Sequence, residues 1–284
     1  MNHSKKSHAL KVIPFSVLAI QLAATWSMAQ PAAAPDAERP LKVGYAVVTP
    51  TSAEPSIMVF ETFGERRGIQ TVQAGVLPSA MTKQAILFVN ASGRLSRNLG
   101  VAIANPGSDT AHITMTLRDH LGEDIKIKTI DVATGAQTAR FVTELFDSQA
   151  QVSKDLIGTL ELASDVAFAV VGLRFRGISF STLPATSLVD GGDVPTRTGF
   201  AGVGGPGAII LPHFVTGGGW ATEIVIANLK EAEVTVRVDL FDQKGDPLVA
   251  TLNGNTASRF TEIRIPGYGV VTLAPRDIRG DSDF

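Results

Sequence analysis

The sequence predicts an all-β protein made of antiparallel sheets, and two observations carry this prediction. The stretch 98–125 returns without a gap as residues 221–248, so that Asn228 follows Asn105 by 123 positions. Short apolar runs also recur along the chain, and Gly, Pro, Asn or Asp separates most of them. Short strands with turn residues between them are typical of β-sandwiches and barrels.

Side chains in the repeated stretch alternate as they do in a half-buried strand. Ile113, Met115 and Leu117 face one way, and polar residues lie between them. The second copy keeps this parity, so each copy presents one apolar sheet face. Each copy then reaches an Asp-x-x-Gly turn, at 119–122 and 242–245, and we expect a hairpin in both.

Further strands are predicted from apolar runs bounded by turn residues, and a single helical turn is predicted at 143–146. The predicted strands cover residues 43–48, 57–63, 69–74, 85–90, 99–104, 112–117, 125–130, 137–142, 156–162, 167–175, 178–181, 208–211, 223–227, 234–241, 248–252, 260–265 and 270–273. No amphipathic pattern is long enough to predict a longer helix.

The first 29 residues have the three parts of a secretory signal peptide. Three lysines precede a mostly apolar run at 12–26, and Ser-Met-Ala at 27–29 is a small-x-small cleavage site. An uncleaved anchor is the alternative, but Pro14 interrupts the apolar run. We therefore expect an exported chain, periplasmic or extracellular, that starts at Gln30 and does not insert in the membrane.

The composition of the mature chain excludes several classes of partner and chemistry. Removing the signal peptide removes three lysines and no acidic residue, which leaves 22 basic against 27 acidic residues. No basic stripe appears, so we expect no nucleic-acid partner. The chain has no cysteine, so the fold depends on apolar cores rather than disulfides. The remaining length suffices for about two domains.

A second, weaker repeat relates residues 44–78 to residues 158–184. Each has a Gly-led strand, a longer apolar strand, a Gly-Ile strand and a Leu-Pro stop. The chain is therefore divided into alternating short and long halves, at 41–78, 83–147, 156–184 and 207–275.

These halves can pair into domains in two ways. The favoured pairing makes 83–184 a continuous β-sandwich and joins 41–78 to 207–275 as a discontinuous β-sandwich. The Gly- and Pro-rich residues 185–206 favour it, because they are longer than a usual loop inside a domain. The alternative domains are 41–147 and 156–275. In both, residues 30–40 are a flexible leader and residues 276–284 a tail.

Several motifs resemble a class of exported bacterial repeat proteins. They are Leu-Pro-His-Phe at 211–214 followed by Gly-Gly-Gly-Trp at 217–220, IANPGSDTAHITMTLRD, TARFVTELF and GLRFRG. The resemblance covers most of residues 41–275 and implies two Ig-like antiparallel β-sandwich domains in tandem. It implies no catalytic residue. Leu229 replaces Pro106 in the second copy, so we expect the Asn-Pro turn not to be kept there.

Three histidines remain after the signal peptide, and none has the spacing of metal ligands. We expect His112 on the outer face of a strand and His120 in a turn. His213 precedes the glycine run and Trp220. His213 and Trp220 are therefore the candidate binding residues, with plain packing at a strand end as the alternative.

Acidic pairs lie in turns, where adjacency does not provide the two opposed carboxylates of a glycosidase. Calcium bound by Asp119, Glu123 and Asp124, or by residues 190–193, is the alternative to solvated turns, which we favour. Residues 199–207 lack the Lys-Ser/Thr ending of a phosphate loop, and no Gly-x-Ser-x-Gly elbow is present. We therefore predict no metal, cofactor or catalytic residue.

The resulting functional prediction is a non-catalytic exported structural or protein-interaction module whose partner is an unknown protein or cell-surface polymer. The alternative is a binding module for an extracellular polymer or cell-surface glycan that uses the loop around Trp220. Few other aromatic rings besides phenylalanine are present (Tyr45 and Tyr268), which counts against a carbohydrate module.

Overall fold

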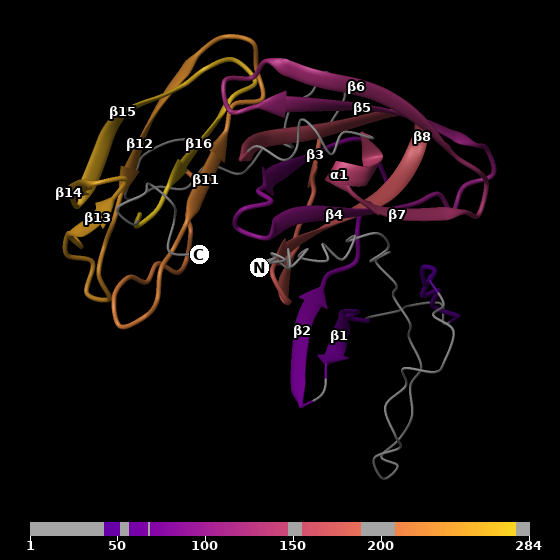
Figure 1. Ribbon diagram of the computed structural model, residues 1–284, viewed down its shortest axis with the longest axis horizontal. Coiled ribbons are helices and arrows are strands. Elements are labelled where there is room, and N and C mark those ends of the chain that lie inside the picture. Colours follow the sequence, from indigo (N-terminus) through magenta and orange to yellow (C-terminus); the bar gives the residue numbers. More distant parts are fainter. Residues whose placement is uncertain (1–42, 52–56, 68, 147–154, 189–207, 277–284) are drawn as a thin grey trace, which may run out of the picture.

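The computed structural model describes residues 43–51, 57–67, 69–146, 155–188 and 208–276 (Figure 1). In this part of the chain the regular structure is strand, apart from the one-turn helix α1 (Val142–Leu145). The strands are β1 (Glu61–Arg67), β2 (Gln70–Val76), β3 (Thr82–Ala91), β4 (Arg97–Ala104), β5 (Ala111–Asp119), β6 (Asp124–Val132), β7 (Gln137–Phe141), β8 (Leu156–Arg176), β9 (Ser179–Leu183), β10 (Thr186–Ser187), β11 (Ile224–Ala227), β12 (Val234–Asp239), β13 (Ala250–Leu252), β14 (Asn255–Ala257), β15 (Arg259–Ile265) and β16 (Val270–Leu273). The paired strands of these residues run antiparallel, so the all-β prediction is confirmed.

One long strand, β8, organises the N-terminal unit. It has 21 residues; its first part pairs with β3 and β5, and its last part pairs with β4 and β9. Strands β10, β6 and β7 extend the sheet from β3, β5 and β4. Figure 1 shows β4 and β7 across from β5 and β6, with α1 between the two layers. Because its first part lies in one layer and its last part in the other, β8 connects the two layers.

Alternation along the strands places the apolar core between these layers. On β5, Ile113, Met115 and Leu117 are at most 1% exposed, as their period-two spacing predicts. Leu160 and Leu162 of β8 are fully buried in the same cluster. Full burial of a side chain of this size contributes about 1.5–3 kcal/mol, so β8 accounts for a large share of the core stability.

The C-terminal unit repeats two strand pairs of the N-terminal unit, in the same register along β11 and along β12 as far as Val236. Strands β11 and β16 pair as β4 and β7 do, and β12 and β15 pair as β5 and β6 do. The matched partners are Ala104–Gln137 with Ala227–Val270, and Ala111–Val132 with Val234–Ile265. The first strand of each pair lies 123 positions after its counterpart, and the second strand lies 133 positions after. The extra ten positions accommodate the inserted hairpin β13–β14. A separate small core surrounds Leu252 and Phe260.

The hairpin β1–β2 lies against the N-terminal unit. The rings of Phe63 and Phe180 stack, with centroids 5.1 Å apart. The Ser79 hydroxyl donates to the Val170 carbonyl over 2.9 Å. Among the described residues, β1 and β2 pair with each other and with no strand of the C-terminal unit. The division into 83–184 and 41–78 plus 207–275, like its alternative, stays a prediction.

Some of the predicted strand positions are wrong. Residues 43–48 and 208–211 form no strand. The runs 156–162 and 167–175 form one strand rather than two. Asp165 breaks the apolar pattern between them, but its carboxylate accepts the His112 backbone N–H over 3.0 Å, so the polar residue is satisfied within the strand.

Candidate functional site

The loop around Trp220 has a backbone that only its glycines adopt easily. Gly217, Gly218 and Gly219 all have positive φ angles, between 59° and 87°, which side chains with a Cβ rarely adopt. The Gly217 and Trp220 backbones exchange two hydrogen bonds of 2.9 and 3.0 Å. The glycine run therefore forms a tight turn that holds the Trp220 side chain outward, where it is 70% exposed.

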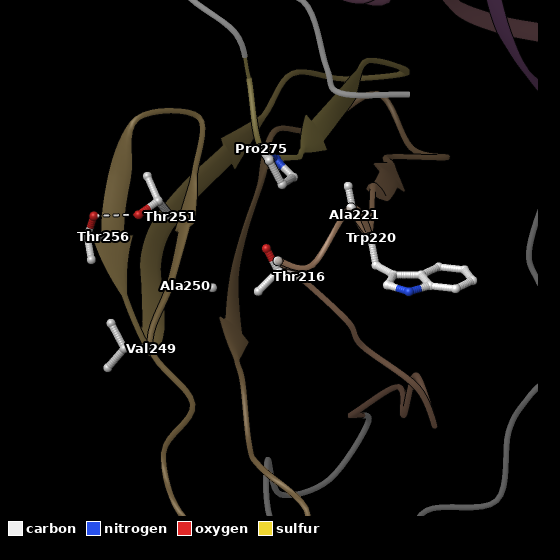
Figure 2. A pocket seen from close by; sticks show the side chains of 10 residues that line it. Thr216, Trp220, Ala221, Val249, Ala250, Thr251, Thr256 and Pro275 are labelled. Carbon is white, nitrogen blue, oxygen red and sulfur yellow. Dashed lines mark hydrogen bonds between the residues drawn. The ribbon is translucent and has the colours of Figure 1, made fainter.

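A hollow of about 690 Å³ lies beside this loop. Figure 2 shows the Trp220 indole on one side and the Thr251–Thr256 pair on the other. The two hydroxyls are hydrogen-bonded over 2.7 Å, and Thr216 adds a third. An exposed aromatic ring with hydroxyls at the same hollow is a combination found at sugar sites, since the ring stacks on the apolar face of a sugar. The hollow is open to solvent, and its lining residues include no carboxylate and no histidine.

The three histidines lie apart from this hollow. His213 is exposed and does not line it, so the structure does not bring the two predicted binding residues together there. His112 projects from β5 and its Nδ1 lies 2.8 Å from the Asp131 carboxylate. This hydrogen bond, together with the negative charge of Asp131, raises the pKa of His112 above its usual value. His120 lies in the predicted turn.

The Asp-x-x-Gly turns bind their own backbone. The Asp119 carboxylate accepts the backbone N–H groups of Leu121 and Glu123 at 2.9 and 3.0 Å. Asp242 repeats this in the second copy. No group of three potential ligands is arranged for a metal in the part of the chain that the structure describes. The alternative calcium loop at 190–193 lies outside the described residues, as does the glycine-rich stretch 199–207.

Asp239 on β12 forms a small charged cluster on the outer face. Its carboxylate accepts hydrogen bonds from Arg237 at 2.7 Å and Arg259 at 2.6 Å. Burial acts to raise the pKa of Asp239, but these two hydrogen bonds and the nearby positive charges lower it below its usual value. The cluster joins neighbouring strands and carries no nucleophile or general base.

A buried asparagine holds the same turn in both copies. Asn105 is fully buried, and its amide donates to the carbonyls of Asp109 and Val132 at 2.7 and 2.9 Å. Its Oδ1 accepts the Gly107 N–H over 3.0 Å. Asn228 makes the corresponding contacts, with its Oδ1 accepting the N–H of Lys230. The expectation that the Asn-Pro turn is lost in the second copy is therefore wrong, because the amide rather than the proline closes it.

Besides the inserted hairpin β13–β14, the two copies differ in their pairing with a long strand, which sequence reasoning missed. In the N-terminal unit, β8 pairs with β3, β4 and β5. Among the described residues, β11 pairs with β16 alone and β12 with β15 alone. Residues 208–211, which follow 85–88 of β3 by 123 positions, form no strand. We call residues 208–211, β11 and β12 the open edge, because each lacks the neighbour that β8 provides in the first copy.

Burial confirms that this difference reaches the core. Leu87 of β3 is 1% exposed, whereas Ile210, at the same repeat position, is 60% exposed. Met115 is fully buried, whereas its counterpart Val238 is only half-buried. The open edge therefore combines unpaired strand edges with exposed apolar side chains, which together form a template for another strand. The short repeat was the feature of the sequence that pointed to this edge. It has one copy for each long half, so each long half is expected to need a short half as its neighbour.

The two units contact each other through repeated turns. The Arg118 guanidinium lies over the Tyr268 ring, 4.9 Å from its centroid. The His120 carbonyl accepts the Val270 N–H over 3.0 Å, and Arg174 pairs with Glu223 over 2.8 Å.

Comparison with protein families, with curated proteins and with solved structures gives no match. Within the described ranges, no helix combines the length and the apolar character needed to cross a membrane. The function is therefore argued from the geometry.

Proposed function

We propose that the protein is a non-catalytic exported interaction module, composed of Ig-like β-sandwich domains in tandem behind a signal peptide. The open edge is the observation that carries this proposal. It offers backbone N–H and C=O groups to an extended partner, and its exposed side chains, such as Ile210, offer an apolar face. Strand addition of this kind takes its affinity from main-chain hydrogen bonds and its specificity from alternate side chains.

A library of extended peptides displayed on phage tests this proposal. We expect the mature chain to enrich peptides that alternate apolar and polar residues. Ile210→Asp places a charge at the open edge and weakens binding at least tenfold. Ile127→Asp is the matched control, because Ile127 is 58% exposed on β6, against 60% for Ile210. Failure to enrich alternating peptides, or equal losses in the two variants, contradicts the proposal.

A second candidate is a binding module for an extracellular polymer or cell-surface glycan. The exposed Trp220 ring beside the hydroxyls of Thr251 and Thr256 favours it. A glycan array decides it: binding that disappears in Trp220→Ala and persists in Ile210→Asp assigns the function to this hollow instead of the open edge.

A further inference from the structure

One segment of the chain resembles the strand that the open edge lacks as a neighbour. The short repeat aligns residues 44–51 with the first part of β8, beginning with Gly44 on Gly158. In this alignment Ala46 and Val48 take the places of Leu160 and Leu162, both fully buried. Val47 between them aligns with Glu161, which is partly exposed in β8. Apolar residues at 46 and 48 therefore fall where β8 places two core side chains.

The match of Gly44 with Gly158, on which this alignment rests, has a structural reason. A Cβ on Gly158 would lie 1.9 Å from the Arg118 carbonyl oxygen, because β8 approaches β5 closely there. The residue that follows Arg118 by 123 positions is Phe241, two residues beyond the end of β12 at Asp239. A strand laid on the open edge as β8 lies on β5 needs a glycine at this point, and Gly44 supplies it. In the structure, Gly44 has no atom within 4 Å of its Cβ position, so its own surroundings do not require glycine.

The hairpin after this segment also matches β8 and its neighbour. Arg67 pairs with Gln70 to close β1–β2, as Arg176 pairs with Ser179 to close β8–β9. Gly-Ile follows the arginine in both. Residues 43–51, β1 and β2 therefore follow one another in the order of the first part of β8, its last part and β9.

In the structure this segment and the open edge do not cover each other. Residues 43–51 form no strand, and Val47 and Val48 are 68% and 59% exposed. The chain that follows is anchored on the N-terminal unit, through the stack of Phe63 on Phe180 and the hydrogen bond of Ser79. Figure 1 shows β1 and β2 apart from β12 and β15.

We propose that residues 43–51 of a second copy of this chain add to the open edge in the position that β8 occupies in the N-terminal unit. Each chain then offers one donor segment and one open edge, and both are satisfied without breaking the anchoring of β1–β2. The contact is heterologous, so it joins copies head to tail into rings or filaments. This inference rests on the proposed function, because it names the partner of the same surface.

Cysteine pairing tests the register, and the chain has no cysteine of its own. Thr114 of β5 pairs with Ala163 of β8, and the corresponding residues are Arg237 and Thr49. Directly opposed strand residues lie close enough for a disulfide. Two single variants, Thr49→Cys and Arg237→Cys, are mixed and oxidised. We expect a mixed disulfide-linked dimer, at least tenfold more abundant than in the control mixture.

The control replaces Arg237→Cys with Thr114→Cys, at the same repeat position on an edge that β8 already covers. Thr49→Cys with Thr114→Cys should give no mixed dimer above background. A double variant, Thr49→Cys with Arg237→Cys, separates the two possible arrangements. A link within one chain, on a particle of single-chain mass, means that the segment closes onto its own C-terminal unit and overturns the proposal. Absence of any link in the mixture overturns it too.

Light scattering of the unmodified chain gives a second measurement. We expect a mass that rises with concentration, and Gly44→Ala should shift this rise to at least tenfold higher concentration. Gly93→Ala is the matched control, since Gly93 also has open space around it. A single-chain mass at all concentrations overturns the proposal. If displayed peptides bind the open edge while the chains neither link nor associate, the proposed function stands and this inference fails.

Discussion

The buried Asn105 allows a prediction whose size follows from its contacts. Asn105→Ala removes two donated hydrogen bonds, to Asp109 and Val132, and one accepted from Gly107. Each is worth about 1 kcal/mol net, so we expect the free energy of unfolding to fall by about 3 kcal/mol. The Val132 carbonyl is buried, so it has no water to replace the amide, whereas Gly107 and Asp109 are exposed residues.

Asn90→Ala is the matched control for this prediction. Asn90 is 5% exposed, and its Nδ2 has no hydrogen-bond partner among the described residues. Asn90→Ala removes a side chain of the same volume, but it breaks no hydrogen bond of the Nδ2 group. Urea unfolding followed by far-ultraviolet circular dichroism measures both. Equal losses in Asn105→Ala and Asn90→Ala would refute the reasoning, because volume rather than hydrogen bonding would then account for the effect.

Three further predictions concern the backbone, pH and metals. Gly158→Ala should lower the melting temperature strongly, because its Cβ would meet the Arg118 carbonyl, whereas Gly93→Ala should change it little; similar melting temperatures contradict this. Since its raised pKa stabilises the folded state, the contribution of His112 is fully present below its ordinary pKa of about 6.5 and is lost as pH rises through the raised value. Asp131→Asn should therefore lower the His112 pKa in an NMR titration, and an unchanged value contradicts the pairing. EDTA should leave the melting temperature unchanged. A drop in melting temperature that added calcium reverses would show that the acidic turns bind calcium.

The hairpins could be predicted from the sequence because their information is local. Alternation over β5, followed by Asp119 and Gly122, specifies a strand, its inward face and the turn that follows. The structure has these features, with Gly122 at a φ of 88° and its N–H donating to the Asp119 carbonyl. The repeat correctly transfers the strand to β12 and the turn to 242–245. The hairpin expected there is reduced to the bridge between Phe241 and Pro247, because the following strand β13 pairs with β14 and β12 pairs with β15.

The role of β8 could not be predicted in the same way, because its partners are distant in sequence. Asp165 interrupts the apolar pattern, so the strand reads as two short ones. Nothing local to residues 208–211 shows that they lack a neighbour, since their apolar character equals that of 85–88 in β3. Trp220 was found from its glycine run, but the hollow beside it depends on β13–β14, which the repeat does not contain.

Comparison of the two copies shows which features form without a strand such as β8 and which features require one. Asn105 and Asn228 make corresponding hydrogen bonds, and β11–β16 keeps the register of β4–β7, so these features do not depend on β8. Strand formation at 208–211 and full burial at Val238 do depend on it, since both are present in the first copy and missing in the second. A strand without its own hairpin is ordered only by its neighbours. The second copy therefore keeps the antiparallel pairs β11–β16 and β12–β15, while residues 208–211 form no strand and Ile210 is exposed.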